Sequence, residues 1–318
     1  MLTAVLIGLR YKVGGDWFNY IEMQNAIGLL SFEDAISFTD PAYAFLNWLS
    51  NRAGVGIWFT NIVCATIFMV GLGRLAGLQP NPPLAILVAV PYFIIVVAMG
   101  YTRQAAAIGV ICYGLATFPE NRIQRLIILV FVAALFHKSA IVIMPILLIP
   151  IFRKNILFAI ASSAVTIIIV FVLLANSADS LIAGYIASDL ESQGALIRVS
   201  MNVIAAIIFI MLRDRFRFTP FVQTYWMTNA VLSIVSLACL GIGVGSTAID
   251  RLALFLIPLQ IVVFAHLPYV LSKRNGALPS ILLGVIGYSF LVQLVWLNFA
   301  DNSHSWVPYS TTILQDDF

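Results

Sequence analysis

The 318-residue sequence has few charged residues. Asp, Glu, Lys and Arg make up 10% of the chain, hydrophobic residues make up 61%, and the mean hydropathy is +1.00. A soluble domain of this length carries far more charge, so the composition excludes one and indicates an integral membrane protein. The net charge of +3 is too small to indicate nucleic-acid binding, and there is no basic tail.

Cysteine and nucleotide-binding motifs are also scarce. Cys64, Cys112 and Cys239 all lie inside apolar runs, and no Cys-x-x-Cys pair or Cys/His cluster occurs. They are predicted to be small buried hydrophobic residues. The sequence has no Gly-x-x-x-x-Gly-Lys loop, so ATP is not expected to drive the chemistry. No cofactor and no metal are predicted.

Long apolar runs are the dominant positive feature. Between residues 56 and 298 they recur at roughly the 20 residues that an α-helix needs to cross a bilayer. The predicted spans are 56–76, 83–99, 101–118, 122–136, 139–152, 155–175, 196–213, 219–241, 251–271 and 277–298. The pair 122–136 and 139–152 is short, so a broken or re-entrant pair is an alternative there. Residues 1–9 are expected to be the end of a helix whose start is missing or unusually short.

The region before the first span is more polar. Residues 18–52 mix carboxylates with apolar positions and are predicted to form amphipathic helices at the membrane interface, with a new helix starting at Pro41. The predicted organisation is a single transmembrane domain, 1–318, with an outer-side polar segment at 10–55, a helix bundle at 56–298 and an outer-side tail at 299–318.

The loop charges set an orientation. When alternate loops are assigned to opposite sides, one side receives ten of the seventeen cations and two of the fourteen carboxylates. Because Lys and Arg are enriched in cytoplasmic loops, this side is predicted to be cytoplasmic. Cytoplasmic loops are then short, and the longer polar segments lie outside, where any chemistry is expected.

Several polar residues are candidates for that chemistry. The densest polar stretch is Arg10–Tyr20, in which Asp16 follows two glycines that permit a tight turn. Arginine grips phosphate with a planar, permanently charged fork, and Arg103 has no carboxylate near it in sequence, so an anionic ligand is expected there. A membrane anchor is an equal alternative for Arg198, an ion pair with Asp250 is the alternative for Arg251, and a plain hydrogen-bonding role is the alternative for His137.

Five motifs in order resemble one family. They are Arg10-x-x-Val-Gly-Gly-Asp16-Trp-x-Asn-Tyr20, Asp40-Pro41-x-Tyr43, Arg103-Gln104-x-x-Ala107, Phe136-His137-x-Ser139-Ala140 and Pro308-Tyr309. In order and approximate spacing they resemble the EpsG family of Wzy-type polysaccharide polymerases over nearly the whole chain. We therefore predict an all-α polytopic membrane protein of about ten to eleven transmembrane helices, GT-C-like, with interfacial and outer-side amphipathic helices.

The resemblance implies a reaction. Such polymerases join oligosaccharide repeat units carried on undecaprenyl diphosphate at the periplasmic or outer face of the bacterial inner membrane, and make O-antigen, capsule or exopolysaccharide. The implied partners are these lipid-linked oligosaccharides, membrane lipid and a chain-length regulator of the pathway. The expected catalytic residues are Arg103 for the leaving diphosphate and, as general base, Asp16 first and His137 second. The expected substrate-binding residues are Arg10, Arg251, Gln104, Tyr20, Arg198 and Tyr309.

Two other functions stay open. An O-antigen ligase-like enzyme uses the same donor, but is expected to carry a larger outer loop than residues 176–195 provide. A transporter or flippase of the lipid-linked unit places its binding groups near the membrane midplane in two symmetric halves, and no internal repeat of that kind is visible.

Overall fold

The computed structural model of the chain describes residues 1–117, 123–152, 154–155, 157–158, 160–161, 164, 194–242, 246–272 and 278–314. Its regular elements up to residue 151 are α1 (Leu2–Gly8), α2 (Trp17–Gly28), α3 (Phe32–Phe38), α4 (Pro41–Ala53), α5 (Ile57–Gly77), α6 (Pro82–Ala89), a π-helix (Val90–Ala98), α7 (Thr102–Thr117), α8 (Ile123–Phe136), a 3₁₀ helix (Lys138–Val142) and α9 (Ile143–Ile151). Those after residue 193 are α12 (Ala195–Leu212), α13 (Pro220–Gly241), α14 (Ser246–Ala253), α15 (Pro258–Leu271) and α16 (Leu278–Phe299), with short 3₁₀ turns at Arg213–Arg215, Leu254–Leu256, Ser303–Ser305 and Thr312–Leu314.

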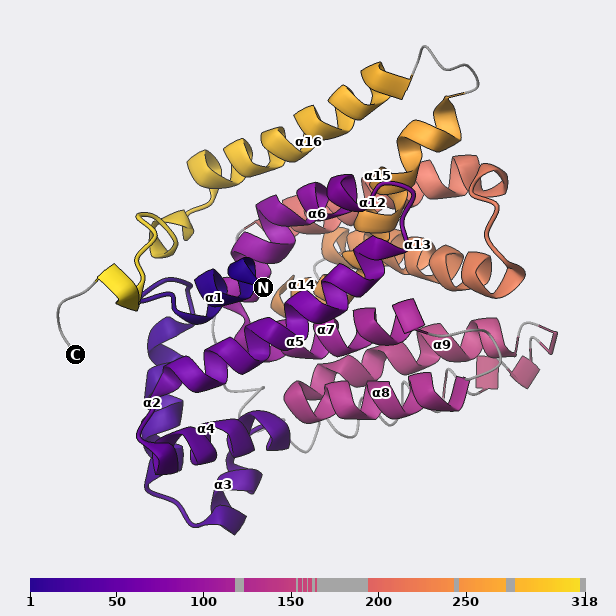
Figure 1. The fold of residues 1–318 in the computed structure, drawn as a ribbon. Helices are drawn as coiled ribbons and strands as arrows, with labels where there is room; N and C mark the ends of the chain where they lie inside the picture. Colours follow the sequence, from indigo (N-terminus) through magenta and orange to yellow (C-terminus); the bar gives the residue numbers. More distant parts are fainter. Residues whose placement is uncertain are drawn as a thin grey trace. The chain divides into compact units, whose positions relative to one another are not determined.

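The helices form two compact units. The first comprises Met1–Leu78, Ala89–Ala140 and Gly287–Phe318, and the second comprises Gln79–Val88 and Ile141–Ile286. Figure 1 locates the helices of both units.

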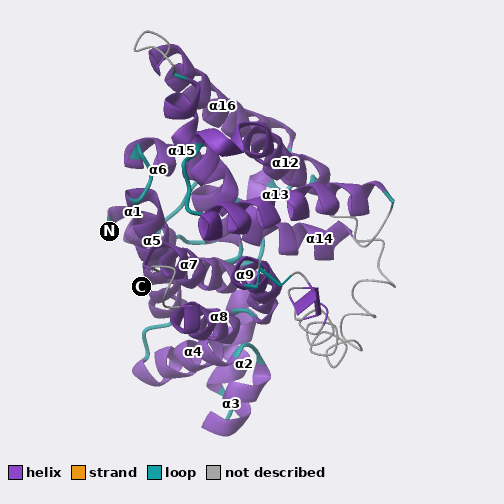
Figure 2. Ribbon diagram, turned by 90° about the vertical axis from the view of Figure 1, so that its right-hand side faces the viewer, coloured by secondary structure: helices purple, strands orange, loops and turns teal. Residues whose placement is uncertain are grey.

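The centre of the first unit is the pair α5 and α7, which lie side by side in Figures 1 and 2. Their backbones meet where Gly71 faces Gly109. A Cβ atom added to Gly71 overlaps the carbonyl oxygen of Gly109, and one added to Gly109 lies 2.5 Å from the Cα atom of Phe68. Glycine is therefore required at this crossing, since small residues are what let two helix backbones approach each other closely.

The predicted interfacial region of the first unit folds into α2, α3 and α4, which pack on one another. Pro41 occupies the first turn of α4 behind Asp40, as predicted, because its fixed φ suits a helix start and its missing N–H has no helical partner to lose there. Gly54 ends α4 in the left-handed region, at φ +68°. Pro41 therefore fixes the start of α4 directly after Asp40, and Gly54 fixes its end.

Polar contacts hold the second unit together around α12. The guanidinium of Arg198 donates to both carboxylate oxygens of Asp250, each at 2.6 Å. One turn further along α12, the Asn202 amide donates to the carbonyl of Ala253 and accepts from the Gln260 amide. These buried polar groups are paired, as groups placed away from water must be.

Within the described residues, five helices are long and apolar enough to cross a membrane: Ile57–Gly77, Ala195–Arg215, Pro220–Gly241, Ile249–Leu271 and Leu278–Phe299. They coincide with five of the predicted spans. Predicted spans 83–99, 122–136 and 139–152 correspond to shorter apolar helices, and 101–118 corresponds to α7, which has 16 residues and a polar first turn. Most of 155–175 lies outside the described residues. The chain is a polytopic helical membrane protein, and the count of ten to eleven spans stays a prediction.

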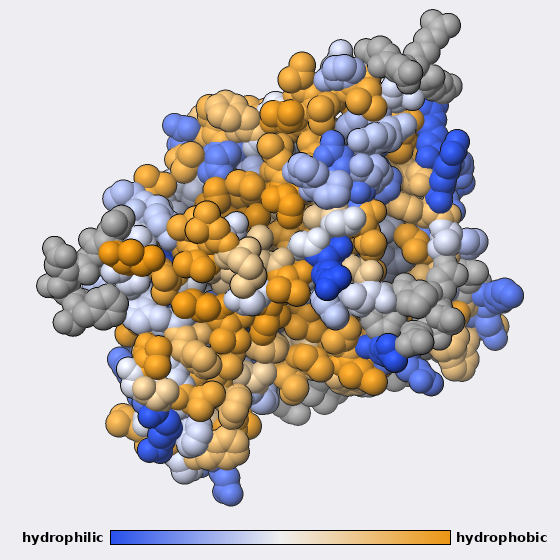
Figure 3. All heavy atoms as spheres, viewed as in Figure 1, coloured by the Kyte–Doolittle hydropathy of each residue, from blue (hydrophilic) through white to orange (hydrophobic). Residues whose placement is uncertain are grey.

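Outward-facing apolar side chains fit a lipid environment. Of the most apolar stretch of α16, 17% is buried inside the protein, and for α13 the share is 28%. Figure 3 shows hydrophobic residues spread over much of the face in view. In water this surface is unfavourable, whereas hydrocarbon accommodates it without cost.

The glycine contact between α5 and α7 gives a direct test. We expect Gly71→Ala to destabilise the protein by about 1–3 kcal/mol, because the added methyl group meets backbone that side-chain rotation cannot move. The measurement is thermal unfolding of the purified protein in detergent.

Gly73→Ala is the matched control, because it changes the same helix two residues away and a Cβ atom there meets nothing within 4 Å. Equal unfolding temperatures for the two variants contradict the proposed close crossing.

Candidate functional site

The segment around Arg10 and the start of α7 form a hydrogen-bonded frame in the first unit. The Arg10 side chain is 1% exposed and donates from Nε to Val13 O (3.1 Å), from Nη1 to Ile7 O (2.7 Å) and from Nη2 to Thr102 Oγ1 (2.7 Å). It also lies 5.5 Å from the centre of the Trp17 ring. Burial lowers the pKa of Arg10 to about 10, so it remains charged at neutral pH. Arg10 therefore links its own loop to the start of α7.

The C-terminal tail covers this frame. Tyr11 N–H donates to Ser310 O at 2.9 Å, Thr312 N–H donates to Leu9 O at 3.1 Å, and the hydroxyl of Tyr309 donates to Leu6 O at 2.6 Å. The two ends of the motif series, Arg10–Tyr20 and Pro308-Tyr309, are thus in direct contact.

Trp306 fits against two glycines of this frame. Its indole N–H donates to Ile95 O at 3.0 Å, and its ring occupies the space that a side chain on Gly100 would need. Gly14, at φ +104°, passes so close to the carbonyl of Met99 that a Cβ atom there overlaps it. These contacts explain the first glycine of the motif pair, Gly14, because only glycine permits this conformation and this approach.

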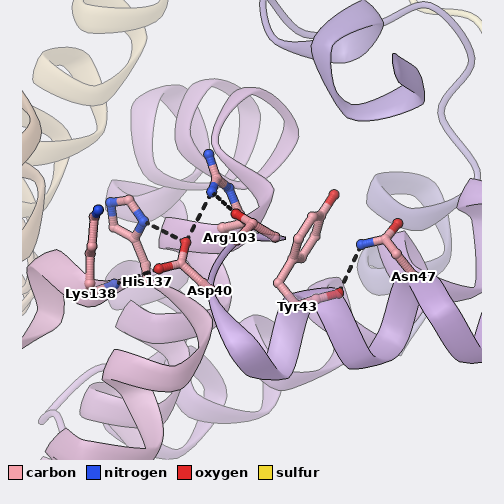
Figure 4. A network of polar contacts seen from close by, with 7 residues as sticks. Asp40, Tyr43, Asn47, Arg103, His137 and Lys138 are labelled. Atoms are coloured by element: carbon pink, nitrogen blue, oxygen red, sulfur yellow. Dashed lines mark hydrogen bonds and ion pairs between the residues drawn. The ribbon is translucent and has the colours of Figure 1, made fainter. Parts of the chain in front are cut away.

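A carboxylate joins three segments beside the frame (Figure 4). Asp40, at the start of α4, pairs through Oδ2 with Arg103 Nη1 at 3.0 Å and with His137 Nδ1 at 3.6 Å. Its Oδ1 accepts from the backbone N–H of Lys138 at 3.1 Å. No carboxylate lies near Arg103 in sequence, and Asp40 supplies one from a position 63 residues away. The anionic ligand expected at Arg103 stays a prediction.

These contacts determine the protonation state of Asp40. Burial alone raises the pKa of this carboxyl, but the His137 and Arg103 side chains and the Lys138 N–H together hold it below its ordinary value. Asp40 is therefore ionised at neutral pH and is a poor proton acceptor. Its part is to orient Arg103 and His137.

Two tyrosines form an aromatic wall next to Arg103. The guanidinium carbon lies 6.0 Å from the centre of the Tyr20 ring and 5.8 Å from that of Tyr43, which fits cation–π contact. Burial raises the pKa of both phenols, so both stay protonated and able to donate.

Several buried polar atoms of the described part of the first unit have no hydrogen-bond partner there. They include Arg103 Nε, Tyr43 Oη, Asn47 Oδ1, Thr60 Oγ1, both amide atoms of Asn61 and Gln24 Nε2. An unsatisfied buried group costs about 1–3 kcal/mol, and native proteins have few of them. Such a concentration of open donors and acceptors is typical of a place that binds hydroxyl-rich or anionic groups, or water.

The remaining predicted residues of the first unit lie nearby. Asp16 is half-buried at the N-terminus of α2, and its charge helps to raise the pKa of Tyr20. Gln104 follows Arg103 and is 3% exposed. Of the predicted residues, Arg103, His137 and Tyr20 are the ones brought together.

Arg198 and Arg251 belong to the second unit. Arg198 is engaged by Asp250 on both carboxylate oxygens, which is a geometry that satisfies a buried guanidinium without a ligand. The sequence interpretation weighed Asp250 as the partner of Arg251, whereas the bidentate pair forms with Arg198. Arg251 is half-buried in α14. Their assignment to substrate stays a prediction.

The sequence reasoning missed Asp40, Tyr43 and the Lys138 N–H as parts of the site. Asp40 and Tyr43 stand in one of the five motifs, Asp40-Pro41-x-Tyr43, but a helix start accounts for Asp and Pro equally well. The signal that identifies Asp40 is charge balance, because a cation as secluded as Arg103 requires a nearby anion.

A comparison with protein-family models matches residues 1–311 to the EpsG family. The chain belongs to the EpsG family. This is a family of Wzy-type polysaccharide polymerase-like proteins, and the match includes every motif quoted above. A polysaccharide polymerase-like function in a membrane-embedded protein follows from this membership. A search of curated proteins and a search of solved structures found no match.

The Asp40 contacts generate a stability prediction. We expect Asp40→Asn to destabilise the protein at pH 7 by about 1–3 kcal/mol, since Arg103 and His137 lose their shared carboxylate; the 26% exposure of Arg103 keeps the cost below that of a fully buried pair. The pKa of Asp40 is depressed in the folded state, so its contribution is present above the ordinary value of 3.8 and disappears as pH falls through the folded-state pKa.

Thermal unfolding between pH 3 and pH 7 measures both effects. Glu22→Gln, which removes one carboxylate from the exposed face of α2, is the control. If Asp40→Asn loses no more stability at pH 7 than Glu22→Gln does, the ion pair is energetically unimportant.

Proposed function

We propose that the chain is a polysaccharide polymerase that joins oligosaccharide repeat units carried on undecaprenyl diphosphate, at the outer face of the bacterial inner membrane. One observation carries the proposal. The Arg103 guanidinium is anchored through Nη1 to Asp40 and Thr39, is 26% exposed, and has no partner for Nε within the described residues. Nη1 is held by protein, and the partly exposed guanidinium keeps donor capacity for an anionic ligand.

Arg103 binds the diphosphate of the donor. During transfer, the bond between the anomeric carbon of the growing glycan and the diphosphate oxygen breaks, and negative charge grows on the leaving group. A guanidinium held in place before reaction stabilises that charge without having to reorganise. Undecaprenyl diphosphate leaves, so the energy comes from the glycosyl phosphate bond and no nucleotide takes part.

His137 is the general base. The acceptor hydroxyl, on the non-reducing sugar of the incoming lipid-linked unit, forms the new bond to the anomeric carbon and gives its proton to the imidazole. Asp40 lies on the Nδ1 side of the ring, 3.6 Å away, which directs proton transfer to Nε2 and favours the imidazolium that forms. Asp16, the first choice from sequence, is the alternative base.

Other residues of the first unit serve the same site. Arg10 holds the loop that precedes α2, and Tyr20 with Tyr43 forms an apolar wall against which a sugar ring can pack. Gln104 and Tyr309 complete the surroundings, with Tyr309 fixing the tail.

The first test is polymerisation by the purified full-length protein. With synthetic undecaprenyl-diphosphate repeat units and no nucleotide, we expect a ladder of products on a gel. Arg103→Lys is expected to reduce the rate at least about tenfold, because an ammonium cannot replace a fork that contacts phosphate and Asp40 together. Arg125→Lys, an exposed cation of α8, is the matched control and keeps the parent rate.

A ladder of parental intensity from Arg103→Lys contradicts diphosphate binding by this side chain. Lipid-linked units that bind but never elongate contradict the polymerase itself, and direct attention to ligase acceptors and to transport in vesicles.

The choice of base is tested separately. We expect His137→Gln to lower the rate by about a hundredfold or more, the usual contribution of a general base, and to leave donor binding intact. Asp16→Asn is measured beside it. A larger loss in Asp16→Asn than in His137→Gln overturns the assignment to His137 and restores Asp16.

A further inference from the structure

A second polar site lies in the second unit, apart from the residues proposed for catalysis. A cavity of about 660 Å³ opens beside the turn that joins α12 to α13. Its polar lining residues are Asp214, Arg215, Arg217, His266, Tyr269 and Ser272. The volume lies in the range of small-ligand sites, which runs from roughly 300 to 1,000 Å³.

The cavity lies where two candidate membrane spans end. The span Ala195–Arg215 finishes in its rim, and so does the span Ile249–Leu271. Since the ends of spans lie at the membrane boundary, the cavity is at the depth of lipid headgroups. The loop charges predict this boundary to be the cytoplasmic one.

The arginines of the cavity are positioned by the aromatic residues between them. Along Arg215-Phe216-Arg217-Phe218, Phe216 is 5% exposed and both arginines are exposed. The Phe216 ring stacks on Phe209 at 5.1 Å and the Phe218 ring stacks on His266 at 5.1 Å. The turn is therefore packed against α12 through Phe216 and against α15 through Phe218. The two arginines alternate with these phenylalanines in sequence.

Arg217 has a strained backbone. Its φ of +53° lies in the left-handed region, which residues with a side chain rarely adopt. Strain of this kind persists where packing on both sides enforces it, as Phe216 and Phe218 do here, and it is frequent at ligand sites. The conformation directs the Arg217 side chain to the same cavity as Arg215.

The lining is rich in hydrogen-bond donors. Two guanidinium groups, the Tyr269 phenol and the Ser272 hydroxyl all can donate, and the His266 Nδ1–H is already directed to the carbonyl of Val262 at 2.8 Å. The one carboxylate, Asp214, is 86% exposed and pairs with Arg213 at 3.7 Å. An anion with several acceptor oxygens fits this set.

We infer that this cavity binds the phosphate group of an anionic membrane lipid, with Arg215 and Arg217 as its principal ligands. The competing explanation is that the arginines only set topology and offset the negative ends of α12 and α15, an effect of about 0.3–1 kcal/mol each. That explanation predicts no preference for one lipid over another and no dependence on the fork shape of arginine.

The experiment is lipid binding to the purified full-length protein in neutral detergent, measured by native mass spectrometry with phosphatidylglycerol and phosphatidylcholine as probes. We expect preferential retention of phosphatidylglycerol, and a loss of affinity of roughly tenfold in the double variant Arg215→Gln with Arg217→Gln. The control pair is Arg74→Gln with Arg125→Gln, which removes the same charge from the same predicted side outside the cavity and is expected to change affinity less than twofold.

Because neutralising these arginines can disturb membrane insertion, the pair Arg215→Lys with Arg217→Lys is measured as well. It keeps the charge and loses the fork, and an affinity at least about threefold below the parent is expected. Equal affinity of the parent and the lysine pair, or equal losses in the cavity pair and the control pair, overturns the inference.

Competition with inorganic phosphate distinguishes a lipid headgroup from a free phosphate ion as the ligand of the cavity. The acyl chains of a lipid add contacts that free phosphate lacks, so millimolar phosphate is expected to leave phosphatidylglycerol bound. Displacement of the lipid at that concentration assigns the cavity to a free phosphate and contradicts a lipid ligand.

Discussion

The ion pair between Asp40 and Arg103 is the interaction on which the first unit depends. It joins the start of α4 to the start of α7, and the same carboxylate holds the end of α8 through His137 and the Lys138 N–H. In a chain with 10% charged residues, each such group is costly to seclude and is tolerated only when paired. One carboxylate therefore fixes three helix ends and holds the guanidinium of Arg103 through Nη1.

Much of the architecture was predictable because it depends on local properties. Length and apolarity predicted the five long spans to within about two residues, and Pro41 predicted the start of α4 because its φ is fixed. α7 is different: its helix is 16 residues long and begins with Thr102 and Arg103, so hydropathy alone predicts a span where the structure has a shorter helix with a polar first turn.

The sequence predicted which segments contribute to the site better than it predicted which side chains contact one another. Arg10, Arg103 and Arg198 look alike in sequence, since each is a cation beside or within an apolar segment, yet Arg10 is fully engaged by carbonyls and Thr102, Arg198 by Asp250, and Arg103 only along one edge. The side-chain partners of the three arginines, unlike the carbonyls that Arg10 also contacts, lie 52 to 92 positions away in sequence. Spacing along the chain carries no information on such pairs.

The contact between the tail and the first loop has a consequence for biosynthesis. Leu9 and Tyr11 are synthesised before the intervening helices, and their partners Ser310, Thr311 and Thr312 emerge only after those helices have left the ribosome. Until then the loop around Arg10 lacks its cover. This contact therefore cannot form until the tail has been made, and a chain interrupted before residue 310 exposes an incomplete loop that quality-control proteases can recognise.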